Sequence, residues 1–229
     1  MPGYTTRELV ICLGGRNYRI RALSDLQQFA DPQHQAERIG ISSALWSLFG
    51  QIWPSGRVMA EAMSTYEIGG KRILELGCGL GLSSLVLQHR HADITASDHH
   101  PLAERFLRHN AAQNHLLAII YRDLRWEVPD LTLGLFNLII GSDVLYESGH
   151  VDQLAATILR HATVDAEILI TDPGRGNSTS FTRALARQGY AVTEQRSRFN
   201  DDDIAPFRGR LLSYRRVTAA TRNAIEYRH

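Results

Sequence analysis

The stretch Arg72-Ile73-Leu74-Glu75-Leu76-Gly77-Cys78-Gly79-Leu80-Gly81 is a short apolar segment that ends in a glycine-rich turn. Its apolar part, 72–76, is typical of a buried β-strand, and the pattern over 80–89 is typical of a helix. Glycines let the backbone turn sharply and approach a ligand without hindrance from a Cβ atom. The first turn of the helix leaves free N–H groups that face the same ligand. A strand, a glycine turn and a helix in this order predict a ligand-binding loop in an α/β fold.

The spacing of these glycines, G-x-G-x-G, separates the turn from two other nucleotide-binding loops. A dinucleotide fingerprint needs its third glycine at position 82, where the chain has Leu82. The G-x-x-x-x-G-K-[ST] loop of nucleoside triphosphatases does not occur in the sequence. With no pyrophosphate to seat, the turn can pack against a nucleoside that carries an amino acid.

A carboxylate, Asp98, follows the next apolar segment, 21 residues after Gly77. At the end of a neighbouring strand such an acid can accept both hydrogen bonds of a ribose diol. The alternative is that Glu75 and Asp98 only cap loops. The glycine turn, its flanking elements and Asp98 together predict S-adenosylmethionine (SAM) as the cofactor.

Two residues after the following strand are candidates for contact with an adenine ring. Asp123 could use its side chain and Leu124 its backbone. Trp126 offers a flat apolar wall, and core packing explains it equally well.

Strand-like and helix-like segments alternate beyond the turn. Strands are expected at 93–97, 117–121, 136–140 and 167–171, and helices at 101–114, 151–161 and 178–188. This alternation predicts a doubly wound, parallel sheet. No helix separates the last two strands, 191–199 and 210–217, so we expect one antiparallel strand near the C-terminus. The predicted fold is Rossmann-like α/β with a mostly parallel, seven-stranded sheet.

The N-terminal third predicts an extension to this core. Residues 8–21 form a hairpin pattern around Gly14-Gly15. The region 24–63 is mainly helical in pattern, with a break at Gly50 and a new start at Pro54, because proline suits a first helical turn. We expect one structural domain, made of the extension 1–66, the core 67–217 and a tail 218–229.

Composition excludes several classes of protein. The formal net charge of +1 gives no overall field toward nucleic acid or anionic lipid, so neither is an expected partner. No segment approaches about 18 continuous apolar residues, and the N-terminus has no signal-peptide pattern. The two cysteines, Cys12 and Cys78, lie in the hairpin and in the glycine turn, so we expect no disulfide and a cytoplasmic location. The ten histidines lack metal-site spacing, so no metal is expected.

Four motifs carry a family resemblance: G-Q-I-W-P-S-G at 50–56, the strand and glycine turn at 73–81, D-V-L-Y at 143–146 and D-P-G-R at 172–175. On these motifs, residues 50–215 resemble the seven-strand methyltransferases, specifically the non-SET protein lysine methyltransferases of methyltransferase family 16 and their bacterial relatives. D-x-x-Y is the most specific motif. D-P-G-R is similar to the enzymes that methylate the electron-transfer flavoprotein β subunit. Leu124-Arg125-Trp126 departs from the family's L-D-W, because Arg125 stands where the motif has its aspartate.

The resemblance implies roles for single residues. The acid and glycines of the turn, with Asp98, would contact SAM, and Trp53 would close over its methionine end. Asp143 and Tyr146 would face the methyl acceptor and are the candidate catalytic residues. The candidate cofactor contacts are Trp53, Glu75, Gly77, Cys78, Gly79, Gly81, Asp98, Asp123, Leu124, Trp126 and Ser142.

Methyl transfer from a sulfonium is an in-line displacement, and an amine acceptor must be neutral to attack. We expect Asp143 to recruit and aim an ammonium that loses its proton to water, and not to act as a strong base. A cap on the following loop is the alternative role for Asp143, and packing is the alternative for Tyr146.

The leading hypothesis for function is N-methylation of a lysine in a partner protein. A small-molecule amine methyltransferase and a non-catalytic SAM-binding subunit stay open, and Leu82 opposes an NAD-dependent oxidoreductase. The acidic run 201–203 could steer a basic substrate, although a solvated turn is the more ordinary interpretation.

Overall fold

The computed structural model describes residues 5–24, 48–201 and 204–217. The predicted helical region is therefore described only from residue 48, and the predicted tail and residues 202 and 203 of the acidic run lie outside the described residues. Within the described residues, no helix combines the length and the apolar character needed to cross a bilayer.

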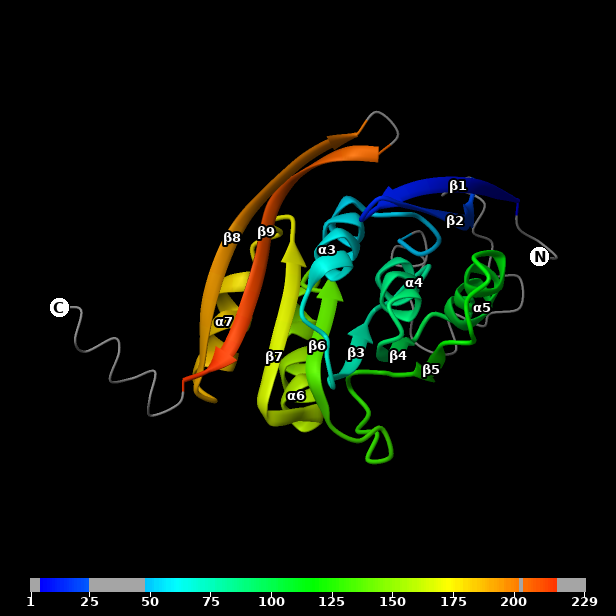
Figure 1. The fold of residues 1–229 in the computed structure, drawn as a ribbon. Coiled ribbons are helices and arrows are strands. Elements are labelled where there is room, and N and C mark those ends of the chain that lie inside the picture. The colour runs from blue at the N-terminus through cyan, green and yellow to red at the C-terminus, as the bar shows by residue number, and fades with distance from the viewer. Residues whose placement is uncertain (1–4, 25–47, 202–203, 218–229) are drawn as a thin grey trace.

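A seven-stranded sheet forms the centre of the molecule, in the order β5-β4-β3-β6-β7-β9-β8 (Figure 1). Strands β5, β4, β3, β6 and β7 pair in parallel, whereas β9 pairs antiparallel with both β7 and β8. The predicted fold class is thus confirmed, including its one antiparallel strand. The strands are β3 (Arg72–Leu76), β4 (Asp93–Asp98), β5 (Ile120–Asp123), β6 (Phe136–Ser142), β7 (Ala162–Asp172), β8 (Tyr190–Asp201) and β9 (Ile204–Arg216).

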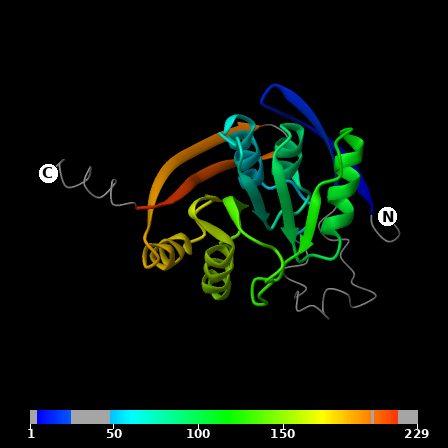
Figure 2. The ribbon, with the colours of Figure 1, turned by 60° about the horizontal axis from the view of Figure 1, so that its bottom comes forward.

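Helices cover both faces of the sheet, as Figures 1 and 2 show. Alternate strand residues enter two apolar clusters because successive side chains of a strand point to opposite faces. On β3, for example, Ile73 belongs to the cluster with α3, α4 and α5, and Leu74 to the cluster with α6 and α7. The helices are α3 (Pro54–Thr65), α4 (Leu82–His89), α5 (Ala103–Gln113), α6 (Val151–His161) and α7 (Ser178–Ala186).

The order of the strands reverses between β3 and β6. From β3 the chain goes first to β4 and β5 on one side, and then returns to β6 and β7 on the other. Leu76 pairs with Gly141, so the glycine turn after β3 and Ser142 at the end of β6 meet at this reversal. Open α/β sheets bind their ligands at such a point, outside the carboxyl ends of the strands.

Strand β5 begins later than its apolar pattern suggests. The predicted strand was 117–121, but pairing with β4 starts where Ile120 meets Thr95 and ends where Asp123 meets Asp98. Leu117 is 76% exposed. The register with β4 therefore sets the strand, and Leu117 lies on the surface, whereas Ile119 is buried in the core.

The last two strands extend past the parallel part of the sheet. Strand β7 ends at Asp172, which pairs with Arg210, while β9 begins six residues earlier at Ile204. Figure 1 shows the β8–β9 ribbon curving beyond the ends of β6 and β7. This ribbon therefore projects on the side of the sheet where the glycine turn lies.

The predicted N-terminal hairpin is present as β1 (Thr6–Leu13) and β2 (Arg16–Leu23). Two asparagines hold it, Asn110 in α5 and Asn114 directly after that helix. Asn114 accepts a hydrogen bond from the Arg19 backbone N (2.8 Å) and donates to the Arg19 carbonyl (2.6 Å). Asn110 accepts from the Arg21 backbone N (2.8 Å) and donates to the Leu80 carbonyl (3.0 Å). Asn110, which is fully buried, thereby ties the hairpin to the glycine turn.

We expect Asn110→Ala to lower the free energy of unfolding by about 2–3 kcal/mol, because the buried Leu80 carbonyl and the partly buried Arg21 N–H lose their partner. Urea denaturation measures this. The control on the same helix is Arg108→Ala, which removes an exposed pair with Glu104 (2.7 Å) and should cost less than about 0.5 kcal/mol. Equal losses for the two variants would contradict the assignment of Asn110.

Candidate active site

The three glycines of the turn all have left-handed backbones, with φ of 64° at Gly77, 54° at Gly79 and 83° at Gly81. They serve different purposes. A Cβ on Gly81 would lie 2.2 Å from Leu107 Cδ1, whereas a Cβ on Gly79 would meet no atom within 4 Å. Gly81 thus permits the packing of the turn against α5. Gly79 presents its backbone to open space, as a ligand-binding position requires.

Asp98 lies against this turn, where the sequence predicted an acid. Its Oδ2 accepts a hydrogen bond from the Gly79 backbone N (2.8 Å), and its Oδ1 accepts from the His100 backbone N (2.9 Å). The Tyr121 hydroxyl donates to its backbone carbonyl (2.8 Å). A carboxylate has about four acceptor positions, so two remain for hydroxyl donors of a ligand.

A small cavity opens above the glycine turn at the reversal of strand order. It brings together six of the predicted cofactor contacts, which are Trp53, Glu75, Gly77, Cys78, Gly79 and Ser142. Sequence reasoning did not assign its other lining residues, Gln51, Ile52, Gly56, Leu80, Leu82 and Ser83. Gln51, Ile52 and Gly56 belong to the G-Q-I-W-P-S-G motif of the family resemblance, so the sequence carried a signal for them.

Trp53 closes one side of this cavity and is fixed by its own contacts. Its indole Nε1 donates to the Leu48 carbonyl (2.8 Å), and its backbone immediately precedes α3. The predicted helix start at Pro54 is confirmed. Helix α3 is tied to the sheet there, because the Thr171 hydroxyl donates to the Ser55 carbonyl (3.0 Å).

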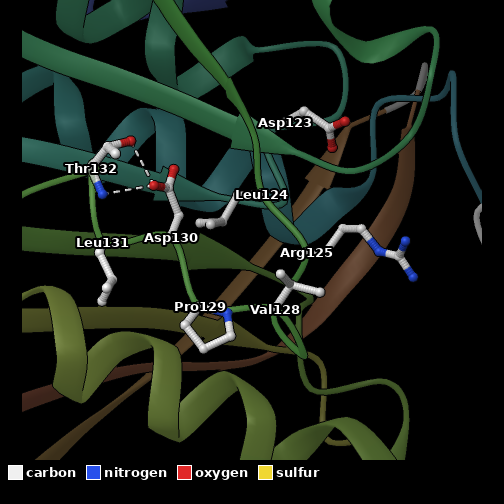
Figure 3. A pocket seen from close by; sticks show the side chains of 8 residues that line it. All are labelled: Asp123, Leu124, Arg125, Val128, Pro129, Asp130, Leu131 and Thr132. Atoms are coloured by element: carbon white, nitrogen blue, oxygen red, sulfur yellow. Dashed lines mark hydrogen bonds between the residues drawn. The ribbon is translucent and has the colours of Figure 1, made fainter.

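A larger hollow of about 450 Å³ lies beside β5 and is lined by residues 123–125 and 128–132 (Figure 3). It contains Asp123 and Leu124, the predicted adenine contacts, and Leu124 N donates to the Asp98 carbonyl (3.1 Å). Its remaining polar groups partly satisfy one another, since Asp130 accepts hydrogen bonds from Thr132 N and Oγ1. We assign the chemistry to the smaller cavity, because Glu75, Gly77 and Gly79 line it. Asp98 and Gly81 do not line it, but Asp98 accepts a hydrogen bond from the Gly79 backbone N at its edge.

Trp126 lines neither hollow. It packs against the cluster under α6 and meets the His150 ring edge-on at 6.1 Å. Its backbone carbonyl accepts a hydrogen bond from Thr157 Oγ1 (3.1 Å). Of the two roles considered for Trp126, this geometry favours core packing.

Glu75 is buried, with 2% of its surface exposed, and links β3 to α4. It accepts a hydrogen bond from the Ser84 hydroxyl, and its backbone carbonyl accepts one from Ser97 Oγ (2.7 Å). Burial raises the pKa of Glu75 to about 7, although hydrogen bonds from Ser84 and Ser83 oppose this. A carboxyl with this pKa can gain or lose a proton near neutrality.

Asp143 and Tyr146 follow Ser142 directly at the end of β6. Asp143 is the one acid among the described residues with a left-handed backbone, φ 54°, and its N–H donates to the Thr171 carbonyl (2.9 Å). Both carboxylate oxygens are taken by Arg175, at 2.7 Å from Nε to Oδ1 and 2.8 Å from Nη2 to Oδ2. Burial raises the pKa of Tyr146 to about 12, so its hydroxyl stays protonated at neutral pH.

Arg175 is a further residue that sequence reasoning missed. Its motif, D-P-G-R, was recognised, but no role was assigned to the arginine. It is separated from Asp143 by 32 positions, and only the parallel pairing of β6 with β7 brings the ends of the two strands together.

Glu75 should make stability depend on pH. Its pKa in the folded protein, about 7, lies above its ordinary value of 4.5. The stability that the protonated carboxyl contributes is therefore fully present below pH 4.5 and is lost as the pH rises through 7. Glu75→Gln is neutral at every pH. We therefore expect the difference in free energy of unfolding between this variant and the unaltered protein to shift by about 3 kcal/mol in favour of the variant from pH 4.5 to pH 8. Urea denaturation without cofactor at both pH values tests this. A difference between the two proteins that does not change with pH would refute it.

Comparison with known proteins places this site in a family. The model of the family described as lysine methyltransferase matches residues 38–188, which is more than half of the chain. Protein N-lysine methyltransferase METTL21A of Danio rerio is 26% identical over 78% of this chain and 77% of its own length. Calmodulin-lysine N-methyltransferase of Arabidopsis thaliana is 30% identical over 62% of this chain, and the match spans only 52% of that protein. The electron transfer flavoprotein beta subunit lysine methyltransferase of Xenopus laevis is 27% identical over 59% of this chain and 54% of its length.

Solved structures support the fold. The ribosomal protein L11 methylase of Lactobacillus delbrueckii subsp. bulgaricus superposes with a TM-score of 0.56 at 16% identity, covering 71% of this chain and 78% of that one. Magnesium protoporphyrin IX methyltransferase of Synechocystis PCC 6803, solved with bound SAM, gives 0.55 at 17% identity, over 69% of this chain and 76% of that one. The chain therefore belongs to the lysine methyltransferase family and is a SAM-dependent methyltransferase.

Proposed function

We propose that the protein transfers a methyl group from SAM to the side-chain amine of a lysine in a partner protein. One observation carries the proposal: the cavity above the glycine turn ends at Ser142, and the acid–tyrosine pair Asp143 and Tyr146 follows at once. The match to the lysine methyltransferase family over 38–188 includes this whole region.

The residues around the glycine turn fit SAM. The open side of Gly79 admits the ligand, and the remaining acceptor positions of Asp98 suit the two hydroxyls of its ribose. Trp53 offers an apolar wall to the methionine end, and Glu75 an acid to its cationic groups. The hollow beside Asp123 and Leu124 leaves room for the adenine at the far side of Asp98.

When bound, SAM supplies a methyl group on a sulfonium. The acceptor nitrogen attacks the methyl carbon in line, and the electron pair of the breaking carbon–sulfur bond stays on sulfur. A free lysine with a pKa of about 10.4 pays about 4.6 kcal/mol to lose its proton at pH 7. The chain's contribution is to orient the amine in a site shielded from water, where orientation is worth roughly 7–11 kcal/mol. Tyr146, with its protonated hydroxyl, can aim the amine through a hydrogen bond or its π face.

Incubation with methyl-tritiated SAM and a host lysate tests this function. We expect label in a protein band, and N-methyllysine after acid hydrolysis of that band. Asp143→Asn should reduce the labelling at least tenfold, because it breaks the two-point pair with Arg175 and leaves that guanidinium uncompensated beside the acceptor. Label confined to small molecules would favour a small-molecule amine as acceptor. Methylarginine, or no label at all, would overturn the proposal.

Two glycine variants separate cofactor binding from folding. Gly79→Ala and Gly81→Ala share the left-handed strain of about 1–2 kcal/mol. Only the Gly81 Cβ meets a buried neighbour, Leu107. We expect Gly79→Ala to weaken SAM binding at least tenfold in calorimetry with little further loss of stability. Gly81→Ala should lose about 1–3 kcal/mol more in urea denaturation, through overpacking. Wild-type affinity for SAM in Gly79→Ala would show that the cofactor does not approach this turn.

A further inference from the structure

The pair between Asp143 and Arg175 occupies the place where the methyl acceptor is expected. The guanidinium binds both carboxylate oxygens, so the acid has no oxygen without a positively charged partner. The Asp143 side chain is 12% exposed and that of Arg175 is 42% exposed. A two-point contact of this kind is the strongest form of an arginine–carboxylate pair. An incoming ammonium therefore meets an acid whose charge is already compensated.

Both partners of this pair are held by the ends of their strands. The left-handed backbone of Asp143 is fixed by the hydrogen bond from its N–H to the Thr171 carbonyl. Non-glycine residues adopt this conformation at a cost, and it persists where surrounding contacts impose it. On the other side, the Asp172 carboxylate accepts a hydrogen bond from Gly174 N (3.1 Å) and shapes the turn that carries Arg175. Arg210 in turn bonds Asp172 (3.3 Å).

Of the charged groups near Asp143, Arg175 is the one described with a direct contact to its carboxylate. Burial is the largest cause of the raised pKa of Tyr146. The negative charges of Asp98, Glu147 and Asp143 raise this pKa further. Glu147 pairs with His150 at 2.9 Å. Arg210 also lies beside Asp172, but it is shared with Glu194 (3.1 Å). Without Arg175 the segment that follows Ser142, with Asp143 and Glu147, would act on its surroundings with a net negative charge.

The balance between the charges of Asp143 and Arg175 decides the protonation state of an acceptor amine. An uncompensated carboxylate within about 4–6 Å stabilises an ammonium and raises its pKa, and an ammonium cannot attack a methyl group. We propose that Arg175 is a positioning residue whose guanidinium compensates Asp143, so that the lysine beside this acid loses its proton and presents a neutral amine. The proposal rests on the proposed lysine N-methylation.

Substitution of Arg175 should change both the rate of the reaction and its dependence on pH. For Arg175→Gln, we expect the rate of methyllysine formation in the lysate assay at pH 7.5 to fall ten- to a hundredfold. The rate should recover by pH 9.5, because each unit by which the amine pKa rises removes about a tenfold fraction of neutral amine. KM for the labelled protein should stay the same or fall, so the loss lies in kcat. Arg175→Lys keeps the positive charge and should restore most of the profile.

The matched control is Arg183→Gln, an exposed arginine on α7, which should keep the unaltered profile. A role of Arg175 in folding alone would lower the rate equally at every pH, and Arg175→Lys would not rescue it selectively. A pH profile of Arg175→Gln that parallels that of the unaltered protein would overturn the proposal.

A second measurement needs no catalysis and separates failure of this inference from failure of the proposed function. With S-adenosylhomocysteine present, n-butylamine serves as a probe for the lysine side chain in an NMR titration from pH 7 to pH 10. The unaltered protein should bind n-butylamine more tightly as the pH rises, because the neutral amine accumulates. Arg175→Gln should bind it more tightly as the pH falls, because the ammonium accumulates. Opposite slopes support the role of Arg175 even if no methyllysine forms in the lysate. Equal slopes, or no binding by either protein, would refute it.

Discussion

The hydrogen bond from Gly79 N to Asp98 Oδ2 joins the two strand ends between which we propose that the cofactor binds. At 2.8 Å it holds the glycine turn of β3 against the end of β4, and the second oxygen of Asp98 holds the backbone of His100. Because Gly79 has no side chain, the acid can lie close to the turn and still face open space. The proposed binding of the ribose and the proposed approach of the amine both depend on this arrangement.

Packing behind the turn makes the arrangement rigid. Gly81 lies against Leu107, and Asn110, one turn farther along α5, donates to the Leu80 carbonyl. The same asparagine binds Arg21 in the N-terminal hairpin. The hairpin, which adds no residue to the cavity lining, thus contributes to the site by holding the helix that supports the turn. An extension of this kind stabilises the active site at a distance from the chemistry.

Local sequence patterns predicted the fold well, because each strand and helix carries its own periodicity. The glycine turn, Asp98 and the start of α3 at Pro54 could be predicted for the same reason, since glycine, proline and an acid at a strand end act through local geometry. The edge strand β5 was displaced because its register depends on β4. Arg175 could not be assigned, because its partner lies on another strand and opposite charges are common throughout the chain.

The distribution of acids around the cavity follows from the two reactants of the proposed reaction. A sulfonium cofactor is cationic when it binds, so the acids that we propose lie beside it, Glu75 and Asp98, need no arginine or lysine partner. The hydrogen bonds described for them come from hydroxyl and backbone N–H donors. An amine acceptor must become neutral, so the acid beside it needs a partner, which Arg175 provides. If the acid beside the acceptor had no positively charged partner, the acceptor would still bind, but as an ammonium, which cannot attack the methyl group. The proposed reaction therefore needs the paired acid, Asp143, on the acceptor side.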